Sequence, residues 1–221
     1  MNKQLNFRYL FAFLAIISSF AAHAKLDNMQ FTIRTGMVQG SYANPLTDSS
    51  SGDQGGTGGQ ANASSDLENG GFSVMPSFDA DIEIFDNFKR SYFARTIIAL
   101  STATGKMHYN YFGLGTRNYY SGTGIQRVFI GEKESVKMVP KVRKYYGVDL
   151  GFSRVSVVSF GTVLSAVSTG IDFGGHWGYT KQMGKSWGLN FEAGLSYAYG
   201  ISTISSSGMN IKILFGATFP L

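Results

Sequence analysis

The chain has 221 residues, no cysteine and a formal net charge of +5, from 19 basic and 14 acidic residues. The lack of cysteine excludes a disulfide framework and a cysteine-ligated metal site. The positive charge is small and scattered, which gives no support to a nucleic-acid-binding protein. The length suits a single domain.

The first 24 residues have the pattern of a secretory signal peptide. Lys3 and Arg8 form a short basic start, an apolar stretch covers Tyr9–Phe20, and Ala22–Ala24 resembles a cleavage site. The alternative is a transmembrane anchor, but an apolar core of about a dozen residues is too short to span a bilayer as a helix. We therefore expect 1–24 to be removed, and 25–221 to form one domain without a helical membrane span.

Alternation of apolar and polar residues predicts about eight β-strands in the mature chain, because successive side chains of a strand point to opposite faces. The predicted strands cover 29–42, 72–84, 91–101, 107–119, 141–153, 169–181, 187–199 and 209–221. The last is the clearest, since Met209–Leu221 presents one continuous apolar face without a charged residue. A strand of this kind at the C-terminus is expected of a transmembrane β-barrel.

Three connections between the predicted strands are long. Residues 43–71 are rich in Gly, Ser, Asp and Asn, which predicts a mobile loop. Between strands four and five, Arg127–Ile130 and Ser135–Val139 predict a small hairpin, and Pro140 argues against a central strand there. Residues 154–168 are fairly apolar and are interpreted as strand extensions around a loop at Gly161.

Backbone groups at a strand edge find no water in lipid, so a sheet within a membrane must close. The sequence therefore predicts an all-β, closed, antiparallel up-and-down transmembrane barrel. The even strand count places both termini on one side, which we expect to be the periplasm. The 43–71 loop then faces outward, and the long 121–144 connection lies in the periplasm.

The alternative is a soluble lipocalin-like barrel, which is apolar inside and polar outside. The charged residues favour the membrane barrel, because a lumen of about eight strands is just wide enough for side chains that can pair across it. Strand two is expected to pair its acids with Arg34 and Arg95, and Glu192 is expected beside Lys212. The predicted luminal charge network contains Arg34, Asp79, Asp81, Glu83, Arg95, Asp149, Asp172, His176, Glu192 and Lys212.

Tyrosine and tryptophan side chains are predicted to anchor the barrel at the membrane–water interfaces, where amphipathic rings gather. The predicted anchors are Tyr145, Tyr146, Trp177, Tyr179, Trp187, Tyr197 and Tyr199.

The signal peptide together with Gly216, Phe219 and Leu221 resembles the small outer-membrane β-barrel family of Gram-negative bacteria, of the OmpA/OmpX type. The tail is similar to the insertion signal read by the barrel-assembly machinery, a glycine followed by hydrophobic or aromatic residues. It departs in ending on Leu221 rather than Phe, and in having Leu214 where a polar residue is usual. The resemblance implies an outer-membrane location, contact with outer-membrane lipid and insertion by that machinery. It implies no single activity.

Two residue groups suggest chemistry, and a structural role is favoured for each. His176 with Asp172 and Ser196 suggests acyl chemistry on lipid, but the alternation directs His176 into the lumen, where a hydrogen-bonded histidine is favoured. The three acids of strand two suit a hard cation, but pairing with arginine is favoured. We expect no metal, cofactor or catalytic residue.

The basic segment 133–144 suggests contact with anionic headgroups or with a periplasmic partner, although a solvated connection is favoured. The favoured function is a non-enzymatic structural or surface-interaction role that uses the 43–71 loop. The alternatives are a narrow pore and a lipid-modifying enzyme.

Overall fold

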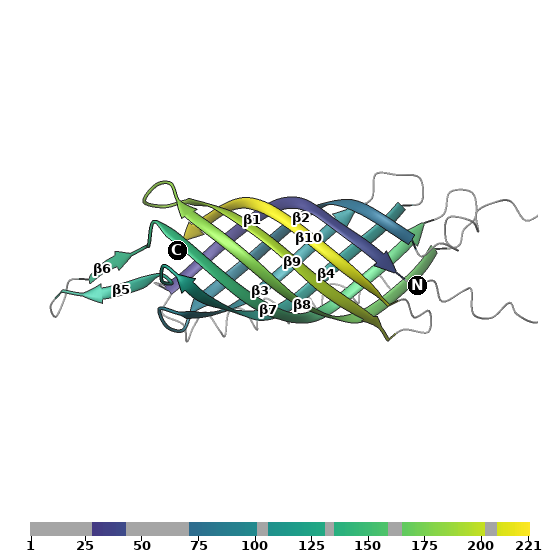
Figure 1. The fold of residues 1–221 in the computed structure, drawn as a ribbon, viewed down its shortest axis with the longest axis horizontal. Coiled ribbons are helices and arrows are strands. Elements are labelled where there is room, and N and C mark those ends of the chain that lie inside the picture. The colour runs from purple at the N-terminus through teal and green to yellow at the C-terminus, as the bar shows by residue number, and fades with distance from the viewer. Residues whose placement is uncertain (1–27, 43–70, 101–105, 131–134, 159–164, 202–206) are drawn as a thin grey trace, which may run out of the picture.

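The computed structural model describes residues 28–42, 71–100, 106–130, 135–158, 165–201 and 207–221. Within them, eight antiparallel strands close into a barrel and two short strands form a separate hairpin (Figure 1). The barrel strands are β1 (Met29–Tyr42), β2 (Gly71–Phe85), β3 (Arg90–Leu100), β4 (Lys106–Ser121), β7 (Val142–Val158), β8 (Ser165–Gln182), β9 (Gly188–Gly200) and β10 (Gly208–Pro220). The hairpin consists of β5 (Gln126–Phe129) and β6 (Ser135–Met138). The predicted fold class is confirmed.

The strands follow one another around the wall in the order β1-β10-β9-β8-β7-β4-β3-β2. β1 begins and β10 finishes at the same end, from which the β5–β6 hairpin protrudes (Figure 1). We call this the terminal end, and the opposite end, where β1 finishes and β10 begins, the loop end. The hairpin is an excursion between β4 and β7, which pair directly with each other.

The first and last strands close the barrel. β1 and β10 pair along their whole length, with Phe31 opposite Phe219 and Arg34 opposite Gly216. The Leu221 amide donates to the Met29 carbonyl at 2.9 Å, which extends the pairing past the end of β10. Every barrel strand therefore has a partner on both sides, and no edge is left open to the surrounding medium.

The observed strands agree with the predicted ones, and β7 and β8 extend furthest beyond their predicted bounds. β7 continues to Val158 and β8 begins at Ser165, so the predicted strand extensions are present on both sides of Gly161, which itself lies outside the described residues. The predicted hairpin between strands four and five is confirmed as β5–β6. The predicted signal peptide lies outside the described residues, as does the predicted 43–71 loop except for Gly71, which begins β2.

Burial shows that charged side chains lie inside the barrel, whereas large apolar side chains cover its outside. The outward side chains of Phe152 and Phe173 are 62% and 59% exposed, whereas the inward side chains of Arg34 and Glu83 are 1% and 0% exposed. A soluble lipocalin-like barrel would have the opposite arrangement, so that alternative is wrong. Among the described residues, none forms a helix of the length and hydropathy needed to cross a membrane.

One predicted interfacial anchor, Tyr145, does not lie on the outer surface. Tyr145 is buried inside the barrel at 1% exposure, whereas the adjacent Tyr146 points outward at 56%. Neighbouring residues of a strand point to opposite faces, so both cannot be anchors. The other six predicted anchors lie on the outer surface.

Candidate functional site

The lumen is filled by side chains in three layers. An apolar layer lies at the loop end, a layer of ion pairs lies in the middle, and a smaller apolar layer lies at the terminal end. The ten residues of the predicted luminal network are all buried inside the barrel.

Arg34 on β1 lies at the centre of the charged layer. Its guanidinium donates to Asp79 at 2.6 Å, to Asp81, and to Glu192 at 3.2 Å. It also donates to the Asn190 side-chain oxygen at 2.9 Å. These partners come from β2 and β9. One side chain therefore links β1 to its neighbour β2 on one side and to β9, which lies beyond β10, on the other.

Two further arginines share the same carboxylates. Arg95 Nε lies 2.8 Å from Asp79 as an ion pair without hydrogen-bond alignment, and its guanidinium also donates to Glu192. Arg117 donates to Asp81 at 2.7 Å and to Glu83 at 2.9 Å. Since the oxygens of the three β2 acids face guanidinium groups, the structure favours salt bridging over the cation alternative.

Lys212 has a different partner from the one predicted. The Lys212 Nζ lies 3.9 Å from the Asp172 Oδ1 and 4.6 Å from the centre of the Tyr111 ring. Glu192 instead contacts three arginines, which include Arg34 and Arg95. The β9–β10 register places Leu214 opposite Glu192, so the two charges are displaced along the wall and each reaches across the lumen instead.

Sequence reasoning missed two arginines that are buried in the lumen. Arg117, which donates to Asp81 and Glu83, was not included in the predicted network. Arg143, buried at the start of β7, was missed; its guanidinium donates to Gln30 at 2.6 Å. The sequence could have shown this, because Arg143 is two residues from Tyr145 and therefore lies on the same inward face of the strand.

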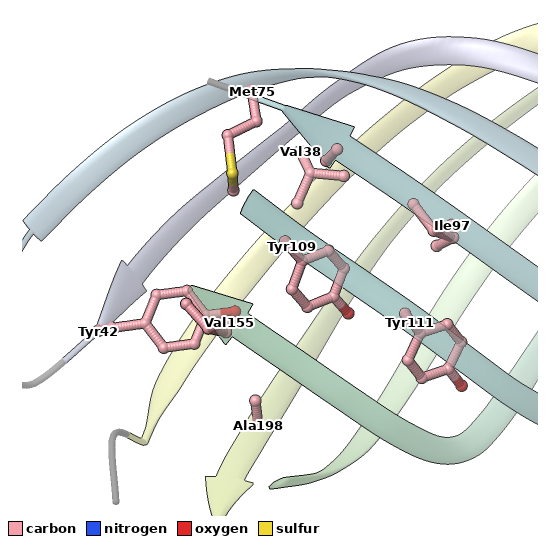
Figure 2. Packing of buried hydrophobic residues seen from close by; sticks show 9 residues of the cluster. Val38, Tyr42, Met75, Ile97, Tyr109, Tyr111, Val155 and Ala198 are labelled. Carbon is pink, nitrogen blue, oxygen red and sulfur yellow. The ribbon is translucent and has the colours of Figure 1, made fainter. Parts of the chain in front are cut away.

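The apolar layer at the loop end consists of residues from six strands. Figure 2 shows their side chains pointing into the barrel from the surrounding wall. The layer contains Val38, Tyr42, Met75, Ile97, Ala99, Tyr109, Tyr111, Val155 and Ala198. Two of its tyrosines also bind buried acids, since Tyr109 donates to Asp172 and Tyr111 to Asp149, at 2.7 and 2.6 Å. These hydroxyls join the apolar layer to the charged one.

His176 does not form the arrangement that lipid hydrolysis requires. Its Nδ1 lies 3.4 Å from Asp149, and its ring packs edge-on against Phe93. Asp172 binds Tyr109 instead, and Ser196 accepts a hydrogen bond from Asn210. The structure therefore does not bring together the three residues of the hydrolase alternative.

A second apolar layer covers the lumen at the terminal end. It consists of Phe85, Tyr119, Ile125 and Tyr145, with Val139 packed against them. Gly122 has a positive φ of 71°, which favours glycine and turns the chain over the barrel mouth after β4. The Gly124 amide then donates to the Phe88 carbonyl at 2.7 Å. The base of the β5–β6 hairpin is thereby held across this end of the barrel.

The three predicted insertion-signal residues lie on or just after β10. Phe219 and Leu221 are exposed on the outer surface. Gly216 lies opposite Arg34 at the β1–β10 closure, where an added Cβ would overlap the backbone oxygen of Ile33. A packing reason for this glycine therefore exists independently of any recognition by assembly machinery.

The barrel has the architecture of a solved outer-membrane protein. Neisserial surface protein A matches with a TM-score of 0.53 and 13% identity, over 86% of this chain and 97% of that one. The chain has the fold of the small outer-membrane β-barrels. This confirms, at the level of fold, the resemblance predicted from the two ends of the sequence.

Weaker structural matches are found to two other barrels. The N-terminal barrel of Pseudomonas aeruginosa OprF gives a TM-score of 0.41 and 11% identity, over 87% of this chain and 97% of that one. Ail of Yersinia pestis gives a TM-score of 0.40 and 12% identity, over 87% of this chain and 98% of that one. No protein-family model matches the chain, and no curated protein matches it in sequence.

Proposed function

We propose that this chain is an integral outer-membrane protein with a non-enzymatic structural or surface-interaction role. The terminal end lies in the periplasm, and the segment 43–71 faces the environment. Short turns on the periplasmic side and longer loops outside are usual for such barrels. In support, the chain passes from β2 to β3 and from β8 to β9 at the terminal end through short turns at 86–89 and 183–187.

The filled lumen is the observation that supports this proposal over a narrow pore. A path along the axis meets the apolar layer at the loop end, the ion-paired layer, and the apolar layer below the hairpin in succession. An eight-stranded barrel is just wide enough to be filled by its own side chains. If the lumen does not conduct, the function is carried by the ends and the outer surface of the barrel.

The purified protein is expected to be electrically silent in planar lipid bilayers. Ions would have to pass between buried side chains such as Arg34, Asp81 and Glu192, which are already paired with one another. The measurement is single-channel current under applied voltage, with an open porin as the positive control. Discrete conductance steps that depend on the folded protein would contradict the proposal and favour the pore.

Epitope tags are expected to separate the two ends in cells of a Gram-negative host. A tag inserted at 56–57 should be labelled by antibody on intact cells, and a tag at 132–133 should be labelled only after the outer membrane is permeabilised. Gel migration with and without boiling serves as the folding control for both variants. Labelling of the second tag on intact cells would show that the proposed orientation is wrong.

A further inference from the structure

Most of the exposed charged side chains among the described residues of the barrel lie at the terminal end. Six basic side chains there are exposed or half-exposed, and among the described residues a single acidic side chain, Asp86, is exposed with them. We call these six residues the basic collar: Lys89, Arg90, Lys141, Lys144, Lys181 and Lys185. Lys137 on the hairpin is not included, because it donates to the backbone oxygen of Leu221.

Collar residues are followed by aromatic residues in a repeated order along the outer surface. In a strand, residues two apart lie on the same face, separated by about 6.6 Å. A basic residue and an aromatic residue have this spacing on three strands: Arg90 with Tyr92, Lys144 with Tyr146, and Lys181 with Tyr179. In the β8–β9 turn, Lys185 likewise precedes Trp187 by two residues, and both side chains are exposed. Aliphatic residues follow on the same face, for example Val148 after Tyr146 and Leu189 after Trp187.

The aromatic residues form a belt just inside the collar, and three of its members contact one another. Trp177 donates through Nε1 to the Tyr120 hydroxyl at 2.5 Å, and Tyr120 stacks on Tyr146 with ring centres 6.2 Å apart. All three side chains are about half exposed. Amphipathic rings in this position are typical of the layer between lipid chains and headgroups.

From the terminal end toward the middle of the barrel, the outer surface presents basic, then aromatic, then aliphatic side chains. A lipid leaflet has the matching order of phosphates, interface and hydrocarbon chains. Basic side chains one step outside an interfacial belt lie where lipid phosphates lie, and a cation there gains attraction from anionic headgroups. The long Lys and Arg side chains also reach toward the headgroup layer from positions near the hydrocarbon edge.

The distribution of the collar around the wall identifies the partner. Its members lie at the β2–β3 turn, on β7 and just before it, and around the β8–β9 turn. These places extend over the arc from β9 through β8, β7 and β3 to β2, and leave β1 and β10 without a member. A protein docking on one side would contact only some of them, whereas a lipid leaflet surrounds the barrel and contacts all of them.

We propose that the basic collar binds the headgroups of anionic phospholipids in the leaflet at the terminal end. It selects lipids with a net negative headgroup, such as phosphatidylglycerol, over zwitterionic lipids such as phosphatidylcholine. This inference rests on the proposed function, because it needs the barrel to lie in a membrane.

Tryptophan quenching by brominated lipids tests the proposal directly. The chain has two tryptophans, and both Trp177 and Trp187 lie in the belt at the terminal end, so their fluorescence reports on lipid at this end. The folded protein is placed in equimolar vesicles of phosphatidylglycerol and phosphatidylcholine, with bromine on the acyl chains of one lipid or the other. Brominated phosphatidylglycerol should quench at least about twofold more strongly, with a ratio that falls as salt rises from 0.05 to 0.5 M.

A variant without four collar charges should lose this preference. In Arg90→Gln, Lys144→Gln, Lys181→Gln, Lys185→Gln, the quenching ratio should fall to about one, because each removed base takes away part of the attraction. The matched control is Arg154→Gln, which removes an outward base from β7 toward the loop end and should leave the ratio unchanged. Gel migration before boiling establishes that each protein is folded.

The opposite results are equally clear. A ratio of one in the unaltered protein, or a ratio retained by the fourfold variant, would overturn the collar proposal. Because quenching is measured on purified protein in symmetric vesicles, it does not depend on orientation in cells. Reversed epitope labelling would therefore overturn the proposed orientation alone, and the two failures are distinguishable.

Discussion

Replacing Arg34 with methionine is expected to lower the free energy of unfolding by about 3 to 5 kcal/mol, which is the usual cost of removing one partner from a buried ion pair. The side chain is 1% exposed and contacts Asp79, Asp81 and Glu192. Methionine keeps much of the volume but leaves these carboxylates with fewer partners in the lumen. The measurement is urea unfolding of the protein refolded into lipid vesicles, followed by tryptophan fluorescence.

Two controls separate the lost pairing from a general effect of the substitution. In vesicles of phosphatidylcholine, which offer the basic collar no anionic headgroup, Arg90→Met makes the same chemical change at an exposed position and should shift stability by less than about 0.5 kcal/mol. Adding Asp81→Asn to Arg34→Met removes a carboxylate that has lost one of its two arginine partners, which restores the charge balance of the layer and should recover about 1 to 2 kcal/mol of the loss. An unfolding midpoint for Arg34→Met equal to that of the unaltered protein would show that the charged layer contributes nothing to stability.

The strands of the barrel wall could be predicted because the alternation of residues along each strand distinguishes its outward face from its inward face. In the strand Gly208–Pro220, every second residue from Met209 to Phe215 is apolar and exposed, and the residues between them are buried. This alternation is a local property, and it holds wherever one face meets lipid and the other meets a lumen. It also gave the correct number of strands, because each change of pattern marks a turn.

The partners inside the lumen were less predictable, because they depend on register and on reach across the barrel. Arg34 meets Asp79 on the neighbouring strand, as the alternation predicts, but it also meets Glu192 on β9. The sequence shows that Glu192 and Lys212 lie on adjacent strands. It does not show the register of these strands, which places Lys212 opposite Gly194 and not opposite Glu192. Pairing across a narrow lumen therefore needs the three-dimensional structure.

The long connection between β4 and β7 acquires a physical role once its position is known. In the proposed orientation this segment is periplasmic, and a long segment on that side is unusual for such a barrel. Here its first residues fold over the mouth, and Ile125 packs on Phe85 and Tyr145. The connection closes the terminal end of the lumen, and its last residues contribute Lys141 to the collar.

Replacing Gly216 with valine is expected to destabilise the closed barrel by about 3 kcal/mol or more, at or above the upper range for overpacking. A Cβ at this position would overlap the Ile33 backbone oxygen and lie 2.6 Å from the Arg34 Cα. Both obstacles belong to the backbone of β1, which cannot rotate away as a side chain does. The variant should therefore close the β1–β10 pairing poorly, and the folded fraction after refolding in detergent should fall on unboiled gels.

Ala217→Val is the matched control, because it adds two methyl groups to the neighbouring residue on the outward face. It should refold like the unaltered protein. The same experiment separates packing from recognition by assembly machinery: Phe219→Ala changes an outward residue and should refold normally in detergent, while its insertion in cells decreases. Normal refolding of Gly216→Val in detergent would show that the close approach to β1 is relieved at little cost, and that recognition in the cell is the remaining reason for a glycine there.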